Sequence, residues 1–103
     1  MIDICFTKKD GHYVELVMSG HADSDERGKD LVCAAVSAIA YGLANALNYM
    51  VEENDAIFEE NELKICIHNP SDESDTILQM AWYQLETVRF SNEEFIKINI
   101  AEV

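Results

Sequence analysis

The chain has 103 residues, close to the commonest size of a single domain and too short for two ordinary ones. Its hydrophobic fraction is 49%, with only four glycines and one proline, which excludes collagen-like, linker-like and broadly disordered classes. Twenty acidic residues against seven basic ones give a net charge of −13, which argues against direct nucleic-acid binding because neutralising phosphates requires clustered Lys and Arg.

The charge and the cysteines also indicate a cellular setting. An acidic surface attracts basic partners and speeds their encounter, although the same excess also serves solubility alone. Three cysteines form an odd set without C-x-x-C spacing, which is typical of a reducing compartment. Asp3, Lys8 and Lys9 interrupt the first apolar run, so no signal peptide is predicted. We therefore expect a cytoplasmic protein.

The first twenty residues predict a β-hairpin. Residues 2–7 alternate, with apolar Ile2, Ile4 and Phe6 on one face, and Lys9-Asp10-Gly11 supplies a turn. In the second run one face carries Val14, Leu16 and Met18, and the opposite face carries Tyr13, Glu15 and Val17. This strand ends at residues 19–21. Residues 22–30 are polar and predict a solvated, mobile loop.

A long helix is predicted from Leu31 to about Glu53. Its apolar residues recur at helical spacing: Val32, Val36, Ile39, Leu43, Leu47 and Met50. Six alanines widen the apolar surface, so we expect the sheet to cover one side and a second subunit to cover another. Polar residues interrupt the segment, and its unbroken apolar portions fall short of the roughly 20 residues that a bilayer requires, so no membrane span is predicted.

The second half predicts two strands, a helix and a final strand. Residues 56–58 and 62–68 form strands joined by Glu60-Asn61, and Ser71 or Ser74 caps the helix that follows. The predicted buried stripe of this helix is Ile77, Met80, Ala81, Leu85 and Val88. Residues 95–101 form the last strand. The order β-β-α-β-β-α-β predicts one α+β domain over residues 1–103, with a mixed or antiparallel sheet covered by two helices.

Cys33 and His21 form a candidate catalytic dyad. Cys33 falls in the first turn of the predicted helix, where unpaired backbone N–H groups and the helix dipole favour a thiolate. Histidine is the usual base that activates such a nucleophile, and His21 lies at a strand end from which it could face the helix. The alternative is that Cys33 is a small core residue and His21 a turn residue.

Two neighbouring residues also have two interpretations each. Asp30 either caps the helix, which local sequence favours, or orients His21 as a third member of the site. Ser37 lies one turn after Cys33 on the same face, so it either positions substrate or bonds a backbone carbonyl. Other sites are weaker candidates. Cys5 and Cys66 fall in strands, His12 lies beside a turn and is expected to be solvated, and His68 has no evident partner. Paired metal ligands and nucleotide motifs are absent from the sequence, so no metal or cofactor is predicted.

At these residues the sequence resembles the ribosomal-processing cysteine protease family, Prp, also called YsxB-like proteins. The resemblance covers essentially the whole chain and is carried by residues 19–22, by Gly28 and Asp30, and by the segment 32–37. It implies that His21 is the catalytic base and Cys33 the nucleophile, with Gly20, Gly28, Asp30 and Ser37 in supporting or substrate-positioning roles.

The resemblance further implies removal of a short N-terminal extension from large-subunit ribosomal protein bL27, with cleavage after a pair of phenylalanines. It also implies a homodimer and a loop before Cys33 that closes on substrate. A strongly basic ribosomal protein suits an enzyme of net charge −13. The competing hypotheses are a non-catalytic acidic adaptor that binds a basic ribosomal or assembly partner, and thiol-based acyl transfer to something other than a peptide.

Overall fold

The computed structural model describes residues 1–20, 29–52, 55–59 and 62–103, including the side chains of all of these except residues 29–30. In chain order the elements are β1 (Ile2–Lys9), β2 (His12–Ser19), α1 (Lys29–Met50), β3 (Asp55–Phe58), β4 (Glu62–Cys66), α2 (Asp72–Phe90) and β5 (Ile96–Glu102). The predicted α+β order is therefore confirmed. The proposed loop 22–30 lies almost wholly outside the described residues.

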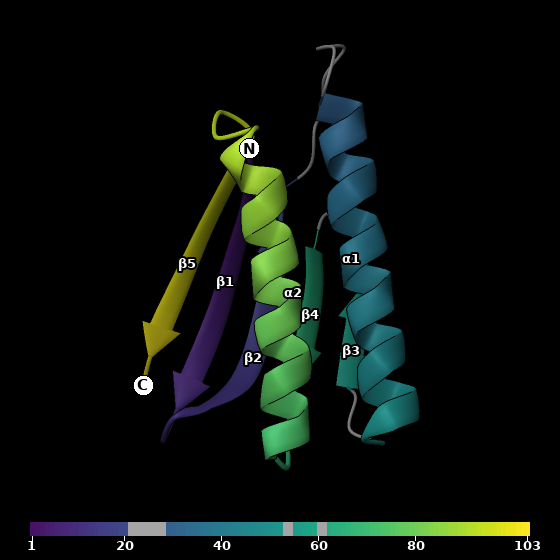
Figure 1. Cartoon of the computed structure of the whole chain (residues 1–103), viewed down its shortest axis with the longest axis vertical. Helices are drawn as coiled ribbons and strands as arrows, with labels where there is room; N and C mark the ends of the chain where they lie inside the picture. Colours follow the sequence, from purple (N-terminus) through teal and green to yellow (C-terminus); the bar gives the residue numbers. More distant parts are fainter. Residues whose placement is uncertain (21–28, 53–54, 60–61) are drawn as a thin grey trace.

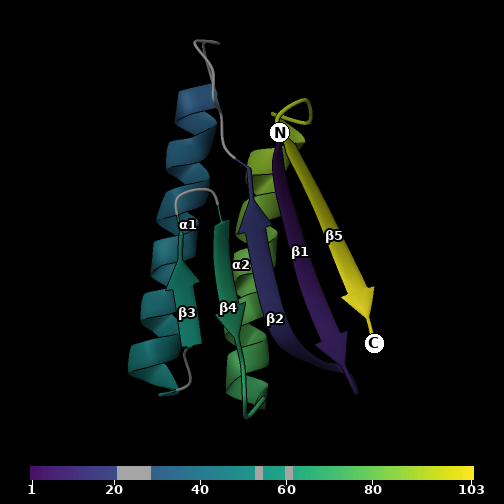
Figure 2. The same ribbon diagram turned by 180° about the vertical axis from the view of Figure 1, so that it is seen from behind.

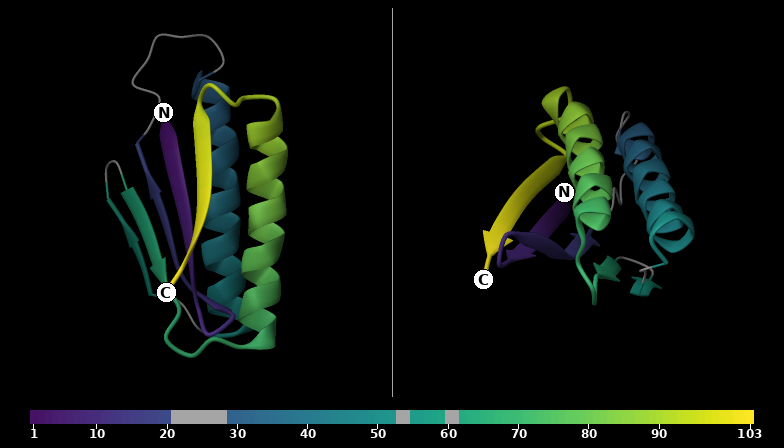
Figure 3. Two further views of the ribbon diagram at one scale, coloured as in Figure 1. Left: turned by 90° about the vertical axis from the view of Figure 1, so that its left-hand side faces the viewer. Right: turned by 60° about the horizontal axis from the view of Figure 1, so that its bottom comes forward.

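The strands form one mixed five-stranded sheet in the order β3-β4-β2-β1-β5 (Figure 1). Neighbouring strands are antiparallel except for β5, which runs parallel to β1 and places Ile2 beside Ile96. Both helices cover the same face of this sheet (Figure 3). A cavity lies where α1, the end of β2 and the β3–β4 pair approach one another.

The core lies between that sheet face and the helices. Apolar side chains that alternate along β1, β2 and β4 point toward the helices and are buried, as the period of two requires. The most deeply buried side chains are Ile4, Phe6, Leu16, Leu47, Ile65, Leu78, Leu85 and Ser74. The predicted inward positions Leu63, Ile65 and Ile67 are confirmed.

The hairpin departs from the predicted alternation at Tyr13. We expected Tyr13 to lie opposite Leu16 and Met18, yet all three are buried. The pairing of β1 with β2 changes register between Thr7 and Lys8, and such an irregularity shifts which side chains face the core. Tyr13 then packs its ring edge-on to Phe6 at 5.7 Å between centroids.

Helix α1 begins two residues earlier and ends three residues earlier than predicted. Val32, Val36, Leu43 and Leu47 are buried as expected, whereas Met50, predicted as core, is 73% exposed because it lies in the last turn. Over Leu31–Met50 the helix is long and apolar enough to cross a membrane by length and composition alone, a test that core helices also pass. Its buried side chains pack into the core of this domain, as those of a core helix do.

Helix α2 starts at a capping box. The Ser71 hydroxyl accepts a hydrogen bond from the Ser74 backbone nitrogen at 3.1 Å, and the Ser74 hydroxyl accepts one from the Ser71 nitrogen at 2.9 Å. Ser71 is therefore the N-cap. The predicted buried stripe was partly wrong: Leu78, Ala81 and Leu85 are buried, whereas Met80 is 59% exposed. Two apolar stripes lie side by side on this helix, and packing against the sheet selects the one that contains Leu78.

Candidate active site

Cys33 lies in the second turn of α1 rather than in the first. The helix begins at Lys29, so the backbone N–H of the fifth residue falls within the i to i−4 ladder. The side chain of a helical residue nevertheless leans toward the helix N-terminus, which directs the Cys33 thiol back toward the first turn. Cys33 is half-buried and packs against the core cluster.

A cavity of about 230 Å³ opens beside Cys33. Three parts of the fold supply its walls. Strands β1 and β2 contribute Ile2, Met18 and the following Gly20; helix α1 contributes Cys33, Val36, Ser37, Ala40 and Tyr41; the β3–β4 region contributes Phe58, Glu59, Glu62 and Leu63. The thiol therefore borders a concave space lined by both apolar and polar side chains, the setting in which ligands usually bind.

An aromatic pair forms one wall of the cavity. The rings of Tyr41 and Phe58 stack with centroids 4.9 Å apart and planes within 7°. Both residues remain about half exposed, at 57% and 45%. Tyr41 could have been found from the sequence, because its spacing from Cys33 and Ser37 places all three near one face of α1. Phe58 could not, since only tertiary packing brings β3 to that helix.

Gly20 shapes the cavity from the end of β2. Its φ is +82°, in the region that L side chains rarely adopt. A Cβ added at Gly20 would also overlap the Met1 carbonyl oxygen. Glycine is therefore required here both by conformation and by the close approach of the backbone that leads into β1.

The structure brings together three of the six predicted site residues. Cys33, Ser37 and Gly20 line one cavity, with Ser37 exposed to solvent. Asp30 is the second residue of α1, so it lies inside the helix and does not occupy the N-cap position that its local sequence favoured. His21, which follows Gly20 in the sequence, and Gly28 lie outside the described residues.

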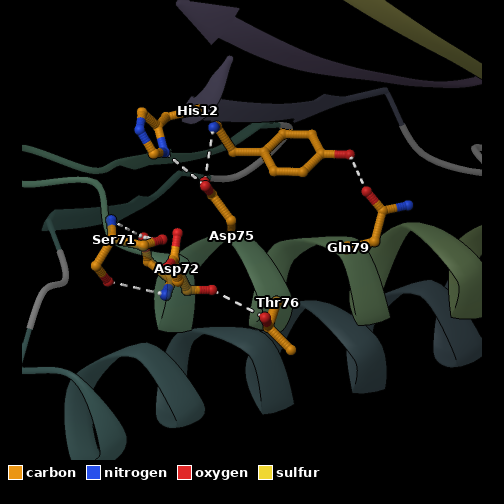
Figure 4. Close-up of polar contacts among 8 residues, drawn as sticks. His12, Ser71, Asp72, Asp75, Thr76 and Gln79 are labelled. Atoms are coloured by element: carbon orange, nitrogen blue, oxygen red, sulfur yellow. Dashed lines mark hydrogen bonds and ion pairs between the residues drawn. The ribbon is translucent and has the colours of Figure 1, made fainter. Parts of the chain in front are cut away.

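The other two histidines lie away from this cavity and pair with carboxylates. His12 Nδ1 lies 2.6 Å from Asp75 Oδ2, and Asp75 Oδ1 accepts a hydrogen bond from the Tyr13 backbone nitrogen at 3.0 Å (Figure 4). His12 is therefore not simply solvated, as expected from its place beside a turn. His68 Nε2 lies 3.2 Å from Asp55 Oδ2, a partner that the sequence did not reveal.

Hydrogen bonds and an ion pair connect His12 and Tyr13 of the hairpin to Asp75 and Gln79 of α2. The Tyr13 hydroxyl donates a hydrogen bond to Gln79 Oε1 at 2.7 Å. Burial, and next the negative charge of Asp75, raise the pKa of Tyr13 because both disfavour the phenolate. Cys5 and Cys66 lie on strands as predicted, and all three cysteines are thiols. Within the described ranges, no three His, Cys, Asp or Glu side chains gather as a metal site.

Comparison with known proteins assigns the chain to a family. The family model for cysteine protease Prp matches residues 1–97. The ribosomal processing cysteine protease Prp of Staphylococcus aureus strain Mu50 is 34% identical over 104 aligned positions, which cover 96% of this chain and 98% of that protein. The protein of that name from Mycoplasma pneumoniae is 34% identical over 85 positions, covering 80% and 82%.

A solved structure agrees with these sequence relatives. The crystal structure of the essential ribosomal processing protease Prp from S. aureus, in complex with a covalently linked product peptide, superposes with a TM-score of 0.86. The two chains are 32% identical, and the match covers 97% of this chain and 99% of the other. By sequence and by fold, this chain belongs to the Prp family of ribosomal processing cysteine proteases.

Proposed function

We propose that this chain removes the N-terminal extension of large-subunit ribosomal protein bL27, in the cytoplasm, with Cys33 as nucleophile and His21 as base. The observation that carries the proposal is the position of Cys33, which borders an aromatic-walled cavity in a chain of the Prp family. The net charge of −13 supports it because a basic ribosomal protein is attracted to an acidic enzyme.

In this proposal His21 accepts the proton of the Cys33 thiol, and the resulting thiolate attacks the scissile carbonyl carbon and forms a tetrahedral oxyanion. N–H groups of the first turn of α1, which have no acceptor within the helix, are suited to hold that oxyanion. His21 donates a proton to the leaving amine as the C–N bond breaks, which leaves a thioester on Cys33. Water then attacks the thioester, His21 accepts its proton, and the thiolate is released with the carboxylic acid product.

The cavity walls are suited to the proposed substrate. Cleavage after paired phenylalanines requires an apolar surface beside the thiol, and the Tyr41–Phe58 stack with Val36 and Ala40 offers one. Ser37 faces the same space one turn from Cys33, where its hydroxyl can position the peptide. For Asp30 we propose orientation of His21, since the capping role is not available to a residue inside the helix.

We also propose a homodimer formed by the outer faces of the helices. A groove of about 600 Å³ runs between α1 and α2, lined mainly by small and apolar residues: Ala38, Ile39, Gly42, Leu43, Ala46, Met50, Thr76, Ile77, Met80, Ala81 and Gln84. Exposed Met50 and Met80 at this surface are the kind of residue that an interface covers. Sedimentation equilibrium of the parent protein and of Met80→Glu tests this: the parent should be a dimer and the variant more dissociated.

The deciding experiment uses a peptide that spans the bL27 extension. Mass spectrometry should show cleavage at one bond by the parent protein and none by Cys33→Ala or His21→Ala. Ser19→Ala, a neighbouring substitution outside the proposed dyad, is the control and should still cleave. Tight binding without cleavage would favour the acidic adaptor. In the adaptor Cys33 would alkylate slowly near neutral pH, whereas a dyad thiol should alkylate quickly and lose that reactivity in His21→Ala.

A further inference from the structure

Strand β3 leaves one edge of the sheet open beside the cavity. It is the outermost strand, and among the described residues it pairs only with β4, so its second edge faces outward (Figure 2). Natural edge strands are blocked by short length, charged side chains, Pro or a bulge; β3 is short and carries Asp55, but its sequence, Asp-Ala-Ile-Phe, contains neither Lys nor Pro. Ile57 and Phe58 stay 49% and 45% exposed.

The hydrogen-bond register identifies which backbone groups face that edge. Glu59 N donates to Glu62 O at 2.8 Å, so these two residues form a hydrogen-bonded pair of the antiparallel ladder. Bonded pairs alternate along such a ladder, so Ile57 bonds to Lys64 and Asp55 to Cys66. The N–H and C=O groups of Ala56 and Phe58 consequently point away from β4, and within the described residues they have no backbone partner.

This edge is continuous with the catalytic cavity. Phe58 lines the cavity that Cys33 lines, and its ring stacks on Tyr41. Cys33 and Tyr41 are eight residues apart on α1, a rise of about 12 Å, which an extended peptide spans with roughly four residues. The β3 strand runs toward the N-terminal end of α1, so its Phe58 end is the end nearer to Cys33 (Figure 2).

We propose that the peptide substrate binds as an added strand on the open edge of β3. The main-chain groups of Ala56 and Phe58 then bond every second residue of the peptide, and its scissile bond reaches Cys33 about four residues from the position that faces Phe58. Glu59 and Glu62 line the same cavity and favour a positively charged peptide. This inference rests on the proposed function, because the occupant is the substrate of that reaction.

The first test modifies the substrate and leaves the protein unchanged. In a series of bL27 extension peptides, each backbone nitrogen is methylated in turn, which removes one N–H donor. Methylation about four and six residues from the scissile bond should raise KM at least about tenfold, while the position between them should tolerate it. An effect that does not alternate, or tolerance at every position, would overturn the added-strand geometry.

The second test closes the edge on the protein side. Ala56→Pro removes an outward N–H without taking a bond from the β3–β4 ladder, which is where an edge strand tolerates proline. The matched control is Ile100→Pro on the opposite edge of the sheet. There the bonds from Ile2 N to Phe95 O and from Val103 N to Lys8 O place the odd-numbered residues of β5 against β1, so Ile100 N–H also points outward. KM should rise at least about tenfold in Ala56→Pro and stay unchanged in the control.

Amide exchange in the Cys33→Ala protein separates this inference from the activity. Added unmodified peptide should slow exchange at the Ala56 and Phe58 amides and leave Ile57 unchanged. If the parent cleaves the peptide and these amides are not protected, docking on β3 is wrong and the activity stands. If the amides are protected and the parent does not cleave, the activity is wrong and the docking stands. Absence of binding refutes both, and protection that depends on protein concentration without peptide assigns the edge to a second copy.

Discussion

Replacing Gly20 with alanine should both destabilise the fold and distort the cavity beside Cys33. Gly20 has a φ of +82°, and a Cβ there would meet the Met1 carbonyl oxygen. That carbonyl belongs to the peptide bond leading into Ile2, whose side chain is buried and whose backbone nitrogen donates to Phe95 O at 2.8 Å. Relieving the overlap therefore shifts a residue that is part of both the core and the cavity wall.

Two separable contributions set the loss in free energy of unfolding expected for Gly20→Ala. An alanine at positive φ costs about 1 to 2 kcal/mol, and forcing the neighbouring backbone aside costs about a further 1 to 3 kcal/mol. Gly11 provides the matched control, since its φ is also +82° and nothing lies within 4 Å of a Cβ built there. Gly11→Ala should therefore carry only the cost of the positive φ. The free energies of unfolding of the two variants should differ by about 1 to 3 kcal/mol.

Urea unfolding of the two variants measures that difference, and kcat/KM on the bL27 peptide gives the second readout. Gly20→Ala should lower both the free energy of unfolding and kcat/KM, whereas Gly11→Ala should leave kcat/KM unchanged because it lies at the other end of the hairpin. Equal free energies of unfolding for Gly20→Ala and Gly11→Ala would refute the role assigned to the Met1 contact.

Three further predictions follow from the described contacts. Burial and Asp75 both raise the pKa of Tyr13 above 10.0, so the neutral phenol contributes to the free energy of unfolding. This contribution should be complete below about pH 10 and be lost at higher pH as the phenol ionises. Asp75→Asn should lower the pKa of Tyr13 in a spectroscopic titration, and an unchanged value would contradict the charge effect. Ser71→Ala should lower the free energy of unfolding by about 0.5 to 2 kcal/mol through loss of the N-cap, as measured by thermal unfolding. The control, Thr76→Ala at an exposed position, should lower it by less than about 0.5 kcal/mol. Equal losses would argue against the capping box. Phe58→Ala should raise KM for the bL27 peptide and leave the alkylation rate of the Cys33 thiol unchanged. An altered alkylation rate would show that the aromatic wall supports the thiol itself.

Local patterns were sufficient to identify most elements. The period of two in residues 2–7 and 62–67 and the helical spacing of Val32, Val36, Leu43 and Leu47 each describe a segment that buries one face. These regularities depend on neighbouring residues only, so they are visible in the sequence. Chain order then restricts the topology to an α+β sheet covered by two helices, which the structure confirms.

The predictions were wrong where the local sequence was compatible with two buried faces or with two helix boundaries. On α2 both the stripe with Met80 and the one with Leu78 are apolar, and only docking against the sheet chooses between them. Tyr13 is buried because the hairpin pairing shifts at Thr7 and Lys8, a feature of two strands in contact. Asp30 lies inside the helix because α1 begins at Lys29, and helix ends are the boundaries that propensity determines least well.

The sequence by itself determined the element order, the acidic character and the choice of Cys33 as candidate nucleophile, because those depend on local spacing and composition. Only the tertiary structure placed Gly20, Cys33 and Phe58 around one cavity, with an open sheet edge beside it. The physical reason is that contacts between residues far apart in the chain are made by packing and strand pairing. Their energies depend on the whole fold, so no local pattern records them.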